Sequence, residues 1–316
     1  MTSMDTGNTK EAPAFVHLDE QRWENLIKKI RRNEVTLFLG AGACYKLLPL
    51  GQEVITKWLP NASDHLVDEL ATQLPHVAQY RKLCVSDEAI TVKADFVEDF
   101  IHGKAEDVDF TNDDQPLSRL AQLPFDIVIT TNYDDLMFRA FAARPNKTPR
   151  YAICQWNNDD DPIDKLNELE CQQRLTPSEQ EPFIFHLHGH HSEPKSLVLL
   201  EEDYEQFLAT VLRPHQGKEA LSDILPTYIQ TAISQRSLLF IGYSLQDMTF
   251  RSVFRGLLNT VTKINTRHSI TVQYNTRMSA TQAKYAGRYF GDMKISFVNQ
   301  SAEDFTKELL ERWKKA

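Results

Sequence analysis

Four histidines at the end of an apolar segment are the clearest candidates for chemistry in this sequence. They stand within six positions, interrupted only by Leu187 and Gly189, and they follow the apolar run 183–185. Imidazole titrates near neutral pH, so histidines in such a place either transfer protons or hold a metal ion. The residues concerned are His186, His188, His190 and His191.

Proton transfer fits this cluster better than metal binding does. A zinc site needs about three protein ligands, and no other segment offers matching His or Cys donors, so we expect no metal. Alternation along a strand places His186 and His188 on one face. His188, directly before Gly189, is the best candidate for a general acid or base. His190 and His191 are expected to lie in the following loop.

A pair of glycines follows a second apolar segment. The run 35–39 leads directly into Gly40, Ala41, Gly42 and Ala43. Glycines let a backbone approach a phosphate closely, and the N-terminus of a following helix carries roughly half a positive charge. A tight turn between a strand and a helix would explain the same residues. On this segment alone, both interpretations stay open.

Polar side chains crowd the end of a third apolar segment, 125–130. Thr131, Asn132 and Asp134 follow it almost without interruption. Thr and Asp are common helix N-caps, so Thr131 or Asp134 could simply begin a helix. A helix cap would account for one of these residues but not for the presence of Asn132. The group therefore favours an amide and a carboxylate placed beside a ligand.

A fourth apolar segment, 237–241, ends in Gly242, and Ser244 follows two positions later. A glycine and a serine at a strand end can bind a phosphate or a ribose, although a serine that only caps a helix is the alternative. Ligands of open α/β sheets bind at the carboxyl edge of the strands. Taken together, the four strand ends predict one nucleotide site with a positioned Asn132 and His188.

The elements that must position these residues alternate along the chain. Short apolar runs predict strands and apolar residues at helical spacing predict helices, which together indicate an α/β fold. We expect a Rossmann-like parallel sheet flanked by helices. Besides the histidine strand, strands are predicted at 35–39, 125–130, 196–200, 237–241, 269–273 and 294–298, and helices at 17–32, 134–143, 201–212, 302–315 and after Gly242 through Leu258.

The chain is expected to hold one α/β domain with an insertion. Residues 17–316 are predicted to form a single domain, in which about 60–115 is an inserted helical module because it shows helical spacing and no strand pattern. Residues 1–16 are polar and are expected to be a disordered lead-in. They lack the apolar core of a signal peptide, and no apolar run of about 18 residues suggests a membrane span. A cytoplasmic protein is expected.

Charge and cysteine content exclude several functions. The net charge is −9, which argues against direct binding of nucleic acid, because phosphate-binding surfaces cluster Lys and Arg. The four cysteines are widely spaced and form no C-x-x-C pair, so neither a zinc ribbon nor a disulfide framework is indicated. Cys44, just after the glycine pair, is expected to serve packing rather than catalysis.

The motifs, in this order, resemble the sirtuin-like NAD-consuming fold in its bacterial branch outside the deacylases. They spread over roughly residues 35–255, and their order and spacing carry the resemblance as a set. The matching segments are 38–43, 48–51, 129–134, 187–189, 197–199 with 202–204, and 240–245 with Asp247.

The resemblance implies a Rossmann-like domain that binds NAD as its substrate. NAD would lie between Gly40–Ala43 and Gly242–Ser244, with Thr131 also contributing to binding. Asn132 and His188 match the catalytic pair of the family. Asp134 matches an acidic residue near the nicotinamide and ribose, and is expected to join the catalytic group.

Two departures from the deacylating relatives shape the expected activity. Those proteins carry a four-cysteine zinc module after the catalytic histidine and a Gly-Ala-Gly-x-Ser loop; this chain lacks the module, and Cys44 follows Ala43. The resemblance therefore implies an NAD hydrolase without zinc, of the kind that depletes NAD in anti-phage defence. A non-catalytic sensor of NAD or ADP-ribose is the alternative, ahead of a protein deacylase or ADP-ribosyltransferase.

The resemblance also implies that partners control such an activity. Related proteins form homo-oligomers or act with a separately encoded protein, either a HerA-type ATPase or a short Argonaute-like protein. We expect one of these arrangements here.

Overall fold

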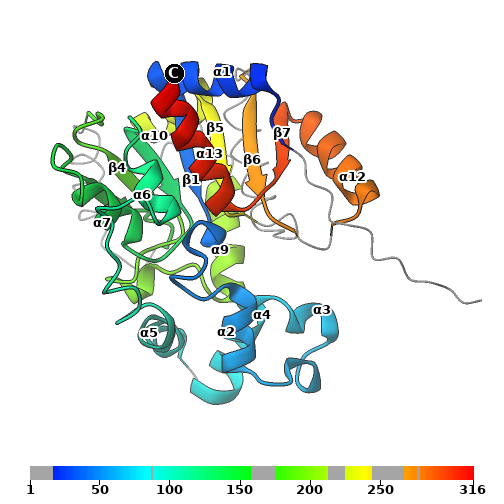
Figure 1. Cartoon of the computed structure of the whole chain (residues 1–316). Helices are drawn as coiled ribbons and strands as arrows, with labels where there is room; N and C mark the ends of the chain where they lie inside the picture. Colours follow the sequence, from blue (N-terminus) through cyan, green and yellow to red (C-terminus); the bar gives the residue numbers. More distant parts are fainter. Residues whose placement is uncertain (1–16, 87, 158–175, 213–224, 244–266, 276–277) are drawn as a thin grey trace, which may run out of the picture.

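The protein is built on a parallel β-sheet with helices on both faces (Figure 1). The computed structural model describes residues 17–86, 88–157, 176–212, 225–243, 267–275 and 278–316. Its seven strands all run parallel, which confirms the predicted Rossmann-like α/β fold class. The strands are β1 (Val35–Leu39), β2 (Ile127–Thr130), β3 (Arg150–Ile153), β4 (Phe183–His186), β5 (Ser237–Ile241), β6 (Ser269–Gln273) and β7 (Ile295–Asn299).

The order of the strands places a topological switch point at the centre of the sheet. Across the sheet the order is β3-β4-β2-β1-β5-β6-β7. From β1 the chain first builds the sheet toward β3, then returns to the centre and continues from β5 toward β7. β1 and β5 therefore lie at the switch point, where connections leave in opposite directions and where ligands of such sheets bind.

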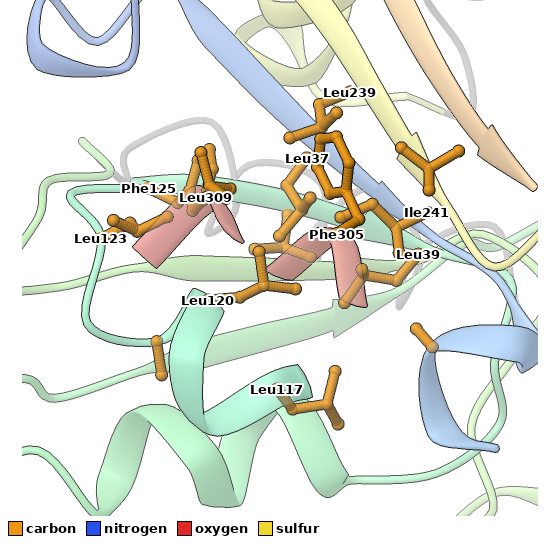
Figure 2. Close-up of a cluster of buried hydrophobic side chains, with 14 of the residues drawn as sticks. Leu37, Leu39, Leu117, Leu120, Leu123, Phe125, Leu239, Ile241, Phe305 and Leu309 are labelled. Atoms are coloured by element: carbon orange, nitrogen blue, oxygen red, sulfur yellow. The ribbon is translucent and has the colours of Figure 1, made fainter. Parts of the chain in front are cut away.

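Side chains alternate between the two faces of the sheet because successive strand residues point to opposite sides. In β1, Leu37 and Leu39 face one core and Phe38 faces the other. Figure 2 shows the first, here called the α13 core, in which Phe305 and Leu309 lie over the sheet. Full burial of each such side chain contributes about 1.5–3 kcal/mol. The opposite face is covered by α10 and α12.

Helices cover both faces and both ends of the sheet, and several carry the caps that their sequences provide. Asp19 caps α1 through the amide of Arg22, and Ser301 caps α13 through the amide of Asp304. The helices are α1 (Glu20–Arg31), α2 (Gly51–Trp58), α3 (Asp68–Ala71), α4 (Leu74–Arg81), α5 (Ala89–Phe100), α6 (Pro116–Leu120), α7 (Leu136–Ala142), α9 (Glu201–Leu212), α10 (Thr227–Gln235), α12 (Ala280–Gly291) and α13 (Ala302–Lys315). Shorter turns are η1 (Ala41–Cys44), η2 (Ala62–Asp64), η3 (Lys82–Ser86) and η4 (Pro194–Ser196).

Helices α2 to α5, here called the helical module, gather at one end of the molecule, and α9 lies between them and the sheet (Figure 1). The module has its own core, which includes Trp58, Phe96 and Phe100. That core also takes in Leu197 and Leu199 from the segment after the histidines. The module is thus packed directly against the chain that follows the candidate catalytic histidine.

The structure corrects several predicted elements. The strand predicted at 196–200 does not form; the segment runs from η4 into α9 and pairs with no strand among the described residues. β3, α10 and α12 were not anticipated from the sequence. The lead-in 1–16 and the helix predicted after Gly242 fall outside the described residues.

Candidate functional site

Three glycines bring the ends of β1 and β5 into direct backbone contact. The amide of Gly40 donates to the carbonyl of Ile241, and the amide of Gly42 to that of Gly242, both at 2.9 Å. Gly242 has a φ of 84°, and a Cβ there would stand 2.2 Å from the nitrogen of Ala43. Glycine is therefore required at this contact, because neither the backbone conformation nor the space admits a side chain.

This contact restricts how a dinucleotide could bind. The amides of Gly40, Gly42 and Ala43 already donate to backbone carbonyls, so they do not form a ready phosphate cradle. Gly40 is followed by η1, a single 3-10 turn of four residues. The helix whose N-terminus was expected to attract phosphate does not begin there. The predicted placement of NAD between Gly40–Ala43 and Gly242–Ser244 stays a prediction. Ser244 lies outside the described residues.

Asn132 is held at the end of β2 by four hydrogen bonds, as part of a buried network. Its side-chain Nδ2 donates to the carbonyl of Gly40 and to Sγ of Cys44, both at 3.3 Å. Its backbone amide donates to Oγ1 of Thr130 at 3.0 Å, and its carbonyl lies 3.2 Å from Nδ1 of His186. The amide group is thereby fixed beside the glycine contact.

Thr131 links β2 to the end of β5. Its amide donates to the carbonyl of Leu39 at 3.1 Å. Its hydroxyl lies 3.4 Å from that of Tyr243, which donates to the same Leu39 carbonyl at 2.9 Å. Thr131 therefore bridges the strands on either side of β1, and Tyr243 is a site residue that the sequence reasoning missed.

Asp134 and Cys44 form the deepest polar pair of the site. The thiol of Cys44 lies 3.7 and 3.9 Å from the two carboxyl oxygens of Asp134, and the amide of Leu136 donates to Oδ1 at 3.0 Å. Burial raises the pKa of Asp134 to about 6. Burial, reinforced by the nearby carboxylate, also raises the pKa of the Cys44 thiol well above its usual value. Cys44 is therefore a protonated thiol and not a nucleophile.

His188 lies on a different side of β4 from His186. The strand ends at His186, so the alternation that predicted a shared face does not extend to His188. The His188 ring packs against Tyr204 and Phe207 of α9, at centroid distances of 5.5 and 5.0 Å. Its Nε2 is buried and has no hydrogen-bond partner in the described chain. Burial lowers its pKa to about 3, so the imidazole is neutral.

The other histidines form an aromatic cluster with Tyr151. The ring of His190 lies 4.5 Å from that of His186, 4.3 Å from that of His191 and 4.9 Å from that of Tyr151. Within the part of the chain that the structure describes, no group of three or more His, Cys, Asp or Glu side chains is arranged to hold a metal ion. His190 and His191 follow the strand, as predicted, although His190 is buried.

The predicted residues thus converge in part. Asn132, Asp134, Thr131 and the three glycines meet at the carboxyl edge between β1, β2 and β5, while His188 approaches from the segment that α9 covers. Cys44 was assigned to packing in the absence of a visible partner, and the structure supplies two, Asn132 and Asp134. The 3-10 turn η1 places the thiol beside Asn132 and Asp134, and no pattern in the sequence predicts this turn.

The fold defines an α/β domain of the Rossmann-like class. The model of the SIR2-like domain family matches residues 126–297, which is 172 of 316 residues, and the chain belongs to this family. SIR2-like domains bind NAD, so the family connects the site with NAD in general. No curated protein matches the sequence significantly. Among the described residues, no helix is long and apolar enough to cross a membrane.

Proposed function

We propose that the protein is an NAD hydrolase that releases nicotinamide and ADP-ribose. The observation that carries this proposal is the buried Nε2 of His188, which has no hydrogen-bond partner in the described chain. Buried polar atoms are almost always paired, so one left over in a site is ready for a ligand. Asn132 and Asp134, at the neighbouring strand end, supply an amide and a carboxylate of the kind that hydrolysis of an N-glycosidic bond requires.

Hydrolysis would break the bond between the nicotinamide nitrogen and ribose carbon one. The electron pair of that bond leaves with nicotinamide, and positive charge develops on the ribose, as in glycoside hydrolysis. The carboxylate of Asp134 stabilises this charge. The water oxygen forms the new bond to carbon one, oriented by the side-chain oxygen of Asn132. The neutral imidazole of His188 accepts the proton that the water loses.

Variants of the two central residues test the proposal. Asn132→Ala and His188→Ala should each lower the rate of nicotinamide release by at least about a hundredfold, because general-base catalysis and positioning each contribute on that scale. Release is measured on the purified protein, alone and with the product of a neighbouring gene. His102→Ala, an exposed histidine at the end of α5, is the matched control and should retain the full rate. Wild-type protein inert toward NAD in every assembly would contradict the proposal.

We further propose that this hydrolysis depletes NAD as the effector of an anti-phage defence system. The support is the family resemblance of the motifs together with the absence from the sequence of a four-cysteine zinc module. Control would come from homo-oligomerisation or from a partner, either a HerA-type ATPase or a short Argonaute-like protein. Loss of cellular NAD upon infection, absent in cells that carry Asn132→Ala, is the expected result.

A sensor of NAD or ADP-ribose is the second candidate, and one observation favours it. The pKa of His188 is lowered to about 3 by burial, which makes the imidazole a weak base but leaves it a good hydrogen-bond acceptor or donor. Calorimetry separates the two functions. A sensor binds NAD tightly without consuming it, whereas a hydrolase produces nicotinamide during the titration.

A further inference from the structure

Cys44 lies between the two polar side chains that the proposed reaction uses. Its Sγ is 3.3 Å from Nδ2 of Asn132 and 3.7 Å from Oδ2 of Asp134. The thiol is 3 % exposed, and it belongs to η1, the turn that the contact between Gly42 and Gly242 holds in place. A residue so enclosed is fixed in position relative to both neighbours.

The donors and acceptors around this thiol allow one arrangement. An ionised carboxylate only accepts hydrogen bonds, so the single S–H hydrogen of Cys44 points to Asp134. The sulfur then accepts from Nδ2 of Asn132. The second hydrogen of Nδ2 goes to the carbonyl of Gly40, at 3.3 Å.

This arrangement determines which way the amide of Asn132 faces. With both Nδ2 hydrogens engaged on the side of Gly40 and Cys44, Oδ1 must face away from them. No side chain or backbone group in the described chain donates to Oδ1. That oxygen is the atom which the proposed reaction assigns to orienting the attacking water.

We propose that Cys44 is a positioning residue that orients the amide of Asn132 and the carboxyl group of Asp134. The inference rests on the proposed function for its effect on rate, but the orientation itself belongs to the structure. A serine hydroxyl has the same donor and acceptor capacity as the thiol, whereas alanine has neither. The chemistry of the residue at position 44, more than its volume, should therefore determine the rate.

Substitutions at two buried cysteines test this inference. Cys44→Ala should lower kcat for nicotinamide release about tenfold or more, the effect of one to two lost hydrogen bonds, and leave KM within about twofold. Cys44→Ser should retain kcat within about threefold. Cys154→Ala is the matched control, because that thiol is equally buried but lies in the core on the other face of the sheet, and it should leave kcat unchanged.

A spectroscopic readout keeps the test separate from the activity itself. The infrared S–H band of Cys44, identified by its loss in Cys44→Ser, should shift to higher frequency in Asp134→Asn. Such a shift in a protein that does not hydrolyse NAD would support the orientation and reject the proposed function. A band unaffected by Asp134→Asn, or equal kcat loss in Cys44→Ser and Cys44→Ala, would overturn the inference.

Discussion

The buried carboxyl group of Asp134 makes the stability of the folded protein depend on pH. Its pKa is raised from 3.8 to about 6, mainly because burial disfavours the charged form. Between these values the folded chain binds a proton that the unfolded chain has lost. The stabilisation by the protonated carboxyl group is complete below about pH 4 and is lost as the pH rises through about 6.

The Asp134→Asn variant should therefore become more stable relative to the wild type as the pH rises. The amide stays neutral, so its advantage in unfolding free energy grows from near zero at pH 4 to about 3 kcal/mol at pH 7. Urea denaturation across this range measures the difference. Asp107→Asn, the same change at an exposed position, should show no such trend. An advantage for Asp134→Asn that does not vary with pH would contradict the burial argument.

The unpaired Nε2 of His188 should destabilise the folded protein, although the proposed reaction requires it. Replacing a buried polar atom that has no partner with an apolar group is neutral or stabilising, so His188→Leu should raise the unfolding free energy by about 1 kcal/mol at pH 7 while abolishing nicotinamide release. His190→Leu is the comparison, because His190 lies 2.8 Å from the hydroxyl of Ser192 and would lose that hydrogen bond. Thermal or urea unfolding of the two variants should give shifts of opposite sign.

At the scale of elements, the first turn of α9 connects the helical module to residues 197–200, the segment that follows the histidines. Two consecutive acidic residues form ion pairs with lysines of the module: Glu202 lies 2.6 Å from Lys82, and Asp203 2.7 Å from Lys93. Asp203 also accepts from the amides of Leu199 and Leu200, next to Val198, whose amide donates to the carbonyl of His188. The module is thereby linked to the backbone of His188.

The Lys93→Met substitution should strongly destabilise the folded protein, because it removes the ion pair with Asp203. Both partners of the Lys93–Asp203 pair are buried, so removing the ammonium group leaves a buried carboxylate without its cation, a change that costs about 3–5 kcal/mol. Urea unfolding measures this loss. Lys28→Met removes an exposed partner of Glu24 and should cost less than about 1 kcal/mol. Equal losses of unfolding free energy in the two variants would mean that the buried ion pair stabilises the protein no more than the exposed one.

The sequence predicts the central strands and the edge strand β7 but misses β3 at the other edge, for physical reasons. The strands at 35–39 and 237–241 are buried throughout and mostly apolar, because both faces of a central strand are covered. β3 escapes notice because Arg150 and Tyr151 at the edge of the sheet are exposed, so no apolar run marks it. The segment 196–200 resembles a strand because it is mostly apolar, but Leu197, Leu199 and Leu200 fill the core of the helical module.

The same contrast applies to the site. The position of Asn132 and Asp134 follows from the sequence, because carboxyl ends of parallel strands share one edge. The position of Cys44 depends on a 3-10 turn, and that of His188 on a turn that ends its strand early. Both turns result from long-range backbone contacts, which no local pattern reports.

At the scale of the whole molecule, stability depends on two cores that share one sheet. In the α13 core, Phe305 is fully buried and its ring stacks on that of Trp23 from α1, with 5.1 Å between the ring centroids. The terminal helix therefore joins α1 to the central strands. It is a structural part of the domain.

Phe305→Ala should lower the unfolding free energy by about 3–5 kcal/mol, because it leaves a large cavity in a packed core. Chemical denaturation measures the loss. Lys307→Ala, an exposed change in the same helix, should cost less than about 0.5 kcal/mol. A small loss in Phe305→Ala would mean that α13 is not an integral part of the core.

The pairing of β1 with β5 also has a consequence for the order of events during protein synthesis. Val35 pairs with Ser237, about 200 residues later in the chain. A ribosome adds about 5–20 residues per second, so β1 waits roughly 10–40 s for its partner. Asn132 and His188 emerge during this interval, but Gly40 and Gly42 have no Gly242 to hold the turn that carries Cys44. A nascent chain that ends before Gly242 therefore lacks an assembled site, and the proposed consumption of NAD begins only after β5 and Gly242 have been synthesised.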